Sequence, residues 1–181
     1  LTNHKYVVKD IMEFKNNQVY YTTTGQDPTQ THLYSVDLKG KGKILTREHG
    51  THQVHISDDG KYFHDQFSSH TIASHDWILD GRGKIVSKKI EAYDKLRSYG
   101  IGRTEIGSIV AKDGTKLVTR MIKPSNFDPM KKYPVLIYVY GGPHAQLITD
   151  SWTSGASLWM HWMAQQGYLV FTVDNRGSAN R

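Results

Sequence analysis

The sequence predicts a mixed fold class, with an all-β part followed by an α/β part. Residues 11–90 contain short segments typical of strands, separated by polar turns, and part of this pattern recurs about 42 residues later. Residues 133–178 instead contain two apolar segments of strand length on either side of a stretch with helical spacing. Hydrophobic residues make up 38% of the 181 residues and aromatic residues 11%, which favours a folded core over disorder.

The repeat in the first half predicts propeller blades. Residues 14–21 match residues 56–63, and residues 33–37 match residues 76–80 at nearly the same offset. A period of about 40–50 residues with about four strands per repeat is typical of a blade. Because two blades cannot close a ring and each blade packs against its neighbours, we expect further blades to precede them in the parent protein.

The second half opens with a predicted β-hairpin. Asp113 and Gly114 lie between the alternating segments 105–110 and 116–122, and an Asp-Gly pair in this context is a strong hairpin signal. Residues 93–103, which precede the hairpin, lack clear periodicity. We therefore interpret them as the crossover between two domains.

A parallel crossover is predicted after the hairpin. The apolar residues 135–140 are expected to form a strand buried on both faces, as inside a parallel sheet. A helix is expected over about residues 152–166 with Gly167 as its stop, and residues 168–173 are expected to form a second buried strand. Strand, helix and strand with apolar strands are typical of a right-handed parallel crossover in an α/β sheet.

The residues that follow the first apolar strand form a candidate oxyanion-binding turn. Tyr140 ends the strand, and Gly141, Gly142 and Pro143 follow it directly. The glycines stop the strand and allow a close approach of the backbone to a ligand. In open α/β sheets, ligands bind at the carboxyl ends of the strands.

The segments YPVLIYVYGGPH at 133–144 and VDNRGS at 173–178 resemble the prolyl oligopeptidase family of serine peptidases, and within it the bacterial dipeptidyl peptidase IV branch. The resemblance implies all-β propeller blades followed by the first half of an α/β-hydrolase domain. Residues 1–92 are then the last blades of the propeller, and residues 93–103 the crossover. Residues 104–181 are the N-terminal part of a truncated catalytic domain.

The resemblance also implies roles for the turn residues. The hydroxyl of Tyr140 is expected to donate to the oxyanion of the tetrahedral intermediate; a structural tyrosine that caps the strand is the alternative. Five other residues are expected to shape or brace the loops around it, rather than to carry the chemistry. They are Gly141, Gly142, Pro143, Asp174 and Arg176.

The triad of a serine peptidase is not found in the sequence. In hydrolase folds the nucleophile lies on a G-x-S-x-G elbow, followed along the chain by the acid and the histidine. No such motif occurs in the 181 residues. Because the chain opens at Leu1 without a methionine and stops within a motif, we expect a fragment whose Ser, Asp and His lie beyond residue 181, inactive by itself.

Three functions agree with these observations. The first is a serine dipeptidyl peptidase that removes N-terminal dipeptides of the Xaa-Pro type. The second is an esterase or acyl-aminoacyl hydrolase of the same fold, and the third is a non-catalytic propeller module that binds a partner. The dipeptidase branch anchors the free amine of its substrate with a glutamate pair on the propeller, and no such pair can be placed here, so exopeptidase and endopeptidase activity both stay open.

Charge does not indicate a nucleic-acid partner. The net charge is +6, but the lysines and arginines are scattered among turns and form no stripe that could follow a phosphate backbone. The sequence contains no cysteine, so disulfides and thiolate metal sites are excluded within it. No membrane span is expected in these residues.

A group of histidines in the first half is interpreted as structural or surface residues, with a metal site as the alternative. His52 and His55, three apart in a predicted strand, would point to opposite faces. We expect no metal and no cofactor. The members of the group are His49, His52, His55, His64, His70 and His75.

The remaining expectations concern partners and location. The substrate is expected to be a peptide and the parent a homodimer, and the family resemblance implies a periplasmic or secreted protein. A hydrolase sheet that lacks its nucleophile strand exposes an unpaired edge, and an incomplete propeller exposes a blade face. The isolated chain is therefore expected to self-associate.

Overall fold

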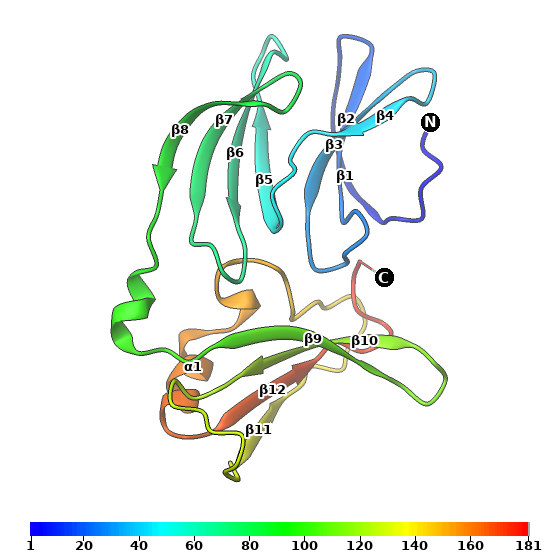
Figure 1. Ribbon diagram of the computed structural model, residues 1–181. Coiled ribbons are helices and arrows are strands. Elements are labelled where there is room, and N and C mark those ends of the chain that lie inside the picture. Colours follow the sequence, from blue (N-terminus) through cyan, green and yellow to red (C-terminus); the bar gives the residue numbers. More distant parts are fainter. Residues whose placement is uncertain (181) are drawn as a thin grey trace. The chain divides into compact units, whose positions relative to one another are not determined.

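Two four-stranded antiparallel sheets form the N-terminal part of the chain in the computed structural model, which describes residues 1–180 (Figure 1). In each sheet the strands lie side by side in sequence order, so each is a meander. The first sheet consists of β1 (Val8–Lys15), β2 (Gln18–Thr23), β3 (His32–Asp37) and β4 (Gly42–Ile44), and the second of β5 (Thr51–Ile56), β6 (Tyr62–Ser68), β7 (His75–Asp80) and β8 (Ile85–Glu91).

The predicted repeat is confirmed by these two sheets. Residues 14–21 and 56–63 form the turn of the first hairpin in each sheet, and the other matching pair forms the third strands, β3 and β7. Asn16 and Asn17 make the β1–β2 turn with φ of 53° and 58°. Asparagine tolerates this left-handed conformation, which tight hairpin turns require.

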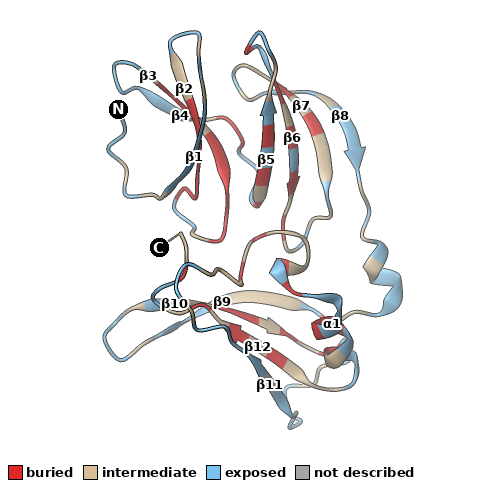
Figure 2. Ribbon diagram, turned by 180° about the vertical axis from the view of Figure 1, so that it is seen from behind, coloured by how far each residue is buried: buried red, intermediate tan, exposed pale blue. Residues whose placement is uncertain are grey.

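The two sheets share one hydrophobic core. Figure 2 shows buried residues along the inner strands of both sheets, whereas most of β1 and β8 is exposed. Leu33, Leu45 and Phe63 have no exposed surface. The core consists of Tyr20, Leu33, Leu45, Val54, Phe63, Phe67, Trp77 and Leu79.

The chain divides into two units. The first comprises Leu1–Tyr93 together with Asp150–Trp152 and Asn180, and the second comprises Asp94–Thr149 and Thr153–Ala179. The second unit contains a four-stranded mixed sheet of order β11-β12-β10-β9. Its strands are β9 (Thr104–Val110), β10 (Lys116–Ile122), β11 (Val135–Tyr138) and β12 (Leu169–Val173), and its helical segments are η1 (Lys95–Tyr99), η2 (Trp152–Gly155, whose first residue belongs to the first unit) and α1 (Leu158–Gln165).

The predicted hairpin and parallel crossover are confirmed in this second sheet. β9 pairs antiparallel with β10, and β11 pairs in parallel with β12 through a connection that contains α1. One face of the sheet packs against α1. This small core consists of Ile122, Ala156, Met160, Ala164 and Val170.

The predicted start of the helix near residue 152 is wrong, because α1 begins only at Leu158. Thr153 and Ser154 have φ of 65° and 55°, in the left-handed region that an α-helix cannot include. On this helix Trp159 is half exposed, whereas Met160 is buried.

The prediction that the first apolar strand is buried on both faces is also wrong. β11 ends at Tyr138, and Val135 and Ile137 are 55% and 66% exposed. The physical reason is its place in the sheet: β11 is an edge strand, paired only with β12 among the described strands. Leu136, on the opposite face, is partly buried against the small core.

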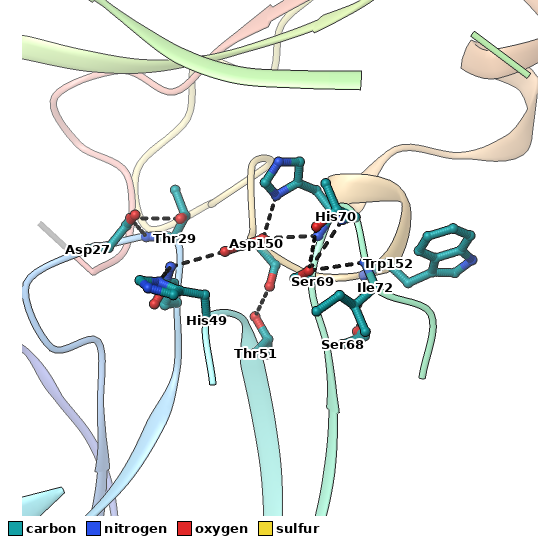
Figure 3. A network of polar contacts seen from close by, with 12 residues as sticks. Asp27, Thr29, His49, Thr51, Ser68, Ser69, His70, Ile72, Asp150 and Trp152 are labelled. Carbon is teal, nitrogen blue, oxygen red and sulfur yellow. Dashed lines mark hydrogen bonds and ion pairs between the residues drawn. The ribbon is translucent and has the colours of Figure 1, made fainter. Parts of the chain in front are cut away.

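Asp150 is a buried carboxylate of the first unit, 5% exposed (Figure 3). One oxygen, Oδ1, accepts a hydrogen bond from the backbone N–H of His70 at 2.9 Å and lies 2.7 Å from Nδ1 of the same residue. The other, Oδ2, accepts from Nε2 of Gln30 at 3.0 Å. Its backbone N–H donates to the carbonyl of Thr29, and its carbonyl accepts from Thr51. The first unit thus holds this residue through every polar group that it has.

Replacing Asp150 with alanine is expected to lower the free energy of unfolding by about 3 kcal/mol. The substitution leaves the backbone N–H of His70 and one N–H of the buried Gln30 amide without an acceptor, and a buried donor left unpaired is costly. Urea denaturation of the protein measures the effect. Asp58→Ala, at an exposed aspartate of the β5–β6 turn, is the matched control and should change little. A loss for Asp150→Ala as small as for the control would contradict a stabilising role.

Candidate active-site loops

The loops that follow β11 and β12 are joined to each other at one edge of the second sheet. Because the two strands are parallel, both loops leave the sheet at the same end. Asn175 donates from Nδ2 to the carbonyl of Gly141 at 2.9 Å, and the backbone N–H of His144 donates to the carbonyl of Gly177 at 2.8 Å. The structure therefore brings together the two segments that carry the family resemblance.

Tyr140 lies at the start of the first loop, with 63% of its surface exposed. Gly141 has φ of 73°, a conformation that favours glycine. A Cβ on Gly142 would lie 2.4 Å from Cε1 of the tyrosine ring, so only glycine allows the ring to lie against this backbone. Within residues 1–180 the Tyr140 hydroxyl has no hydrogen-bond partner, and it is free to donate to a ligand.

Asp174, at the end of β12, holds the continuation of the first loop. Its carboxylate is 4% exposed and accepts the backbone N–H groups of Leu147 and Ile148 at 3.0 and 3.1 Å. Its own backbone N–H donates to the carbonyl of Val118 in β10. Asp174 thus connects the loop to the sheet and does not face solvent.

Arg176 forms a bidentate ion pair with Asp113 in the β9–β10 turn. Its Nε and Nη2 atoms lie 2.8 and 2.9 Å from the two carboxylate oxygens, and both side chains are about half exposed. These hydrogen bonds hold the pKa of Asp113 well below its usual range. The pair ties the second loop to the hairpin.

Arg120, a buried arginine in the middle of β10, was not predicted as a site residue from the sequence. It is 1% exposed and donates to atoms of four other residues in the second unit. Burial lowers its pKa, and the nearby negative charge of Asp174 partly opposes this effect. The only signal in the sequence is an arginine within a segment that otherwise reads as an ordinary alternating strand.

The histidines of the first half differ in burial and in their polar partners. His52 is buried and lies 2.9 Å from both carboxylate oxygens of Asp65, whereas His55 is exposed, as predicted for residues on opposite faces. His64 pairs with Asp76. In the part of the chain that the structure describes, no group of three or more His, Cys, Asp or Glu residues could hold a metal ion. No helix among residues 1–180 is long and apolar enough to cross a bilayer.

Comparisons with known proteins place these features in context. Residues 1–74 match the family described as "Dipeptidyl peptidase IV (DPP IV) N-terminal region". A probable dipeptidyl-aminopeptidase B from Penicillium rubens is 30% identical over 178 residues, which is 92% of this chain and 19% of that protein. The chain thus spans about a fifth of the length of the curated relatives that it matches.

Two crystal structures resemble the chain over 99% of its length and 26% of theirs. A putative dipeptidyl aminopeptidase IV from Bacteroides ovatus is 35% identical with a TM-score of 0.89. Dipeptidyl peptidase 4 from Porphyromonas gingivalis is 25% identical with a TM-score of 0.88. The mostly β chain, with few helices, matches the propeller-like N-terminal region of these relatives.

His161 on α1 is a buried imidazole, 2% exposed, and neither of its ring nitrogens has a hydrogen-bond partner among the described residues. Burial lowers its pKa from the ordinary value of 6.5, and the positive charge of Arg120 lowers it further. The folded protein therefore holds His161 neutral under conditions in which the unfolded chain takes up a proton.

The stability of the protein is expected to fall on acidification below about pH 6.5 in part because of His161. A lowered pKa in the folded state means that the unfolded state binds more protons, which costs at most about 1.4 kcal/mol per pH unit. His161→Leu should keep the stability at pH 8 and lose less of it at pH 5. His55→Leu, at an exposed position, is the control. Equal losses on acidification for wild type and His161→Leu, measured by urea denaturation, would contradict this assignment.

Proposed function

Because the chain belongs to the dipeptidyl peptidase IV family, we propose that it is part of a serine peptidase that removes N-terminal dipeptides of the Xaa-Pro type from peptides. The relatives named above support the dipeptidyl peptidase activity through their names alone. The observation that carries the proposal is the position of Tyr140. It follows β11, in a loop that is hydrogen-bonded to the loop after β12. Its side chain is exposed, and its hydroxyl has no hydrogen-bond partner within residues 1–180.

In this proposal the two parts of the chain have different roles. Residues 1–92 are the last blades of a propeller, residues 93–103 are the crossover, and residues 104–181 are the N-terminal part of an α/β-hydrolase domain. The mixed sheet supports the last assignment, because an antiparallel hairpin precedes the parallel pair of β11 and β12. The parent assembles as a homodimer.

The proposed chemistry is acyl transfer through a Ser-Asp-His triad located beyond residue 181. The serine attacks the carbonyl carbon of the scissile bond, and the carbonyl oxygen becomes an alkoxide. The Tyr140 hydroxyl donates a hydrogen bond to this alkoxide, beside the backbone N–H that follows the serine. Gly141, Gly142 and Pro143 shape the turn, and Asp174 and Arg176 brace the loops around it. The mechanism requires neither a metal nor a cofactor.

The isolated 181-residue chain is expected to have no peptidase activity and to self-associate. The triad is not in these residues, and β11 presents an apolar edge strand that can pair with another chain. Light scattering at tens of micromolar and an Xaa-Pro amide assay on the same purified sample test both expectations. Turnover that persists after removal of trace contaminants would refute the first, and a monodisperse monomer would refute the second.

Tyr140→Phe in the full-length protein is expected to lower kcat by about a hundred- to a thousandfold, or about 2.7–4 kcal/mol. The substitution removes only the hydroxyl, which binds the developing alkoxide more strongly than the ground-state carbonyl, so KM should change little. The melting temperature should also change little, because the hydroxyl makes no hydrogen bond within residues 1–180.

Tyr99→Phe, at an exposed tyrosine of the same unit, is the matched control and should keep full activity. An Xaa-Pro amide and a simple ester are assayed in parallel. A preference for the ester would favour an esterase or acyl-aminoacyl hydrolase of the same fold. Wild-type kcat for Tyr140→Phe together with a lowered melting temperature would show that Tyr140 is a structural residue.

A further inference from the structure

Arg120 is the largest fully buried side chain among the described residues. Burial of a charged group is costly unless the group is hydrogen-bonded. The Nη1 atom of Arg120 donates to the carbonyls of Leu147 and Ser154 at 3.0 and 2.7 Å. Its Nη2 atom lies 3.0 Å from Oγ1 of Thr172 on β12 and 3.3 Å from Sδ of Met160 on α1. The guanidinium therefore holds a loop, a strand and a helix at one point.

The two carbonyls that Arg120 contacts lie at opposite ends of one loop segment. A single nitrogen binds both Leu147 and Ser154, so the two ends of segment 147–154 are held close together. Gly155 shows how closely the ends approach: a Cβ on it would lie 2.6 Å from the carbonyl oxygen of Leu147. This glycine has φ of 73°, which also favours the absence of a side chain.

Asp174 completes the attachment with the opposite charge. Its carboxylate accepts hydrogen bonds from the N–H groups of Leu147 and Ile148, whereas the Arg120 guanidinium donates one to the carbonyl of Leu147. Both the N–H and the C=O of Leu147 are thus bonded to buried charged groups. Because Arg120 lies on β10 and Asp174 follows β12, the sheet fixes the position of Leu147, at the near end of this segment.

The same loop, which follows β11, contains Tyr140 near its start. Its ring makes no hydrogen bond within residues 1–180, so the position of its hydroxyl depends on the backbone that carries it. That backbone is held by Asn175 at Gly141, by Gly177 at His144 and by the Arg120–Asp174 pair from Leu147 onward. Between His144 and Leu147 there are only two residues, which leaves the turn little freedom to move independently of the pair.

We propose that Arg120 is a positioning residue for catalysis: with Asp174 it fixes the loop that begins at Tyr140, and thereby the direction of the Tyr140 hydroxyl toward the oxyanion. This inference rests on the proposed oxyanion role of Tyr140. Arg120 is buried and touches neither substrate nor reacting atoms, so its effect on the reaction passes through the tyrosine. A displacement of about 1 Å in such a group can reduce turnover by about a hundredfold.

A double-mutant cycle in the full-length protein tests the proposal. Arg120→Lys keeps the charge but has a single side-chain nitrogen in place of the Nη1 and Nη2 atoms of the guanidinium, so it cannot bind all four acceptors. We expect kcat for an Xaa-Pro amide to fall by about 10- to 100-fold with little change in KM. In the Tyr140→Phe background the same substitution should change kcat less than about twofold, because the hydroxyl that it positions is already absent. Arg103→Lys, at an exposed arginine of the same unit, is the control and should keep full activity in both backgrounds.

The outcomes separate the two proposals. Equal losses of kcat for Arg120→Lys in both backgrounds, or no loss in either, would overturn the positioning role of Arg120. The oxyanion role would still be supported by the loss of kcat in Tyr140→Phe alone. Full kcat for Tyr140→Phe would overturn the oxyanion role, and the positioning role with it. If Arg120→Lys does not fold, Thr172→Val takes its place, because it removes one acceptor and keeps the shape of the side chain. Its smaller loss of kcat must likewise disappear in the Tyr140→Phe background, and a loss that persists there overturns the proposal.

Discussion

Parallel pairing of β11 with β12 is the constraint on which the second unit depends. A parallel pair cannot be joined by a tight turn, so the connection must cross over one face of the sheet, and here it contains α1. The same pairing places the carboxyl ends of both strands at one edge. Gly141 and Asn175, which are far apart in the sequence, can therefore form a hydrogen bond. The edge at which the loops meet is thus a consequence of strand direction.

The crossover creates a second requirement, because its first part is a long loop with little regular structure. Backbone N–H and C=O groups in such a loop need partners when they are buried. Asp174 supplies acceptors for two N–H groups, and Arg120 supplies donors for two carbonyls. Within the same stretch of sequence, Asp150–Trp152 belongs to the first unit, where the Asp150 carboxylate is satisfied in turn. In this loop, buried charged side chains bind backbone groups that neighbouring strands would bind in a sheet.

Regular elements of this chain could be predicted from local patterns. The hairpin around Asp113 and the two repeated meanders depend on turn residues and alternation, which the sequence shows directly. The start of α1 could not be predicted in this way. Helical spacing continues through Thr153 and Ser154, but the loop forces both residues into the left-handed region. The exposure of β11 also depends on its neighbours in the sheet and not on its own apolar sequence.

The candidate site shows the same division. Tyr140 and its glycines were found because adjacent residues form a recognisable turn, whereas Arg120 and Asp150 act through contacts with residues distant in the sequence. An arginine in an alternating strand gives no sign that its guanidinium will be buried, since the same pattern fits an arginine at the solvent-exposed face of a sheet. Only the positions of Leu147, Ser154 and Thr172 around it distinguish the two cases.

In the proposed mechanism, a turn that contains two glycines has to hold a preorganised donor. Glycine loses more conformational freedom on folding than any other residue, so a turn with Gly141 and Gly142 is intrinsically mobile. Electrostatic stabilisation of a transition state, however, depends on donors that are already in place and need no reorganisation. The glycines are required for the approach of the tyrosine ring to the backbone, and they cannot themselves hold it there. Rigidity must therefore come from outside the turn. Hydrogen bonds to residues of β10 and to residues that follow β12 provide it, and these residues are Arg120, Asp174, Asn175 and Gly177.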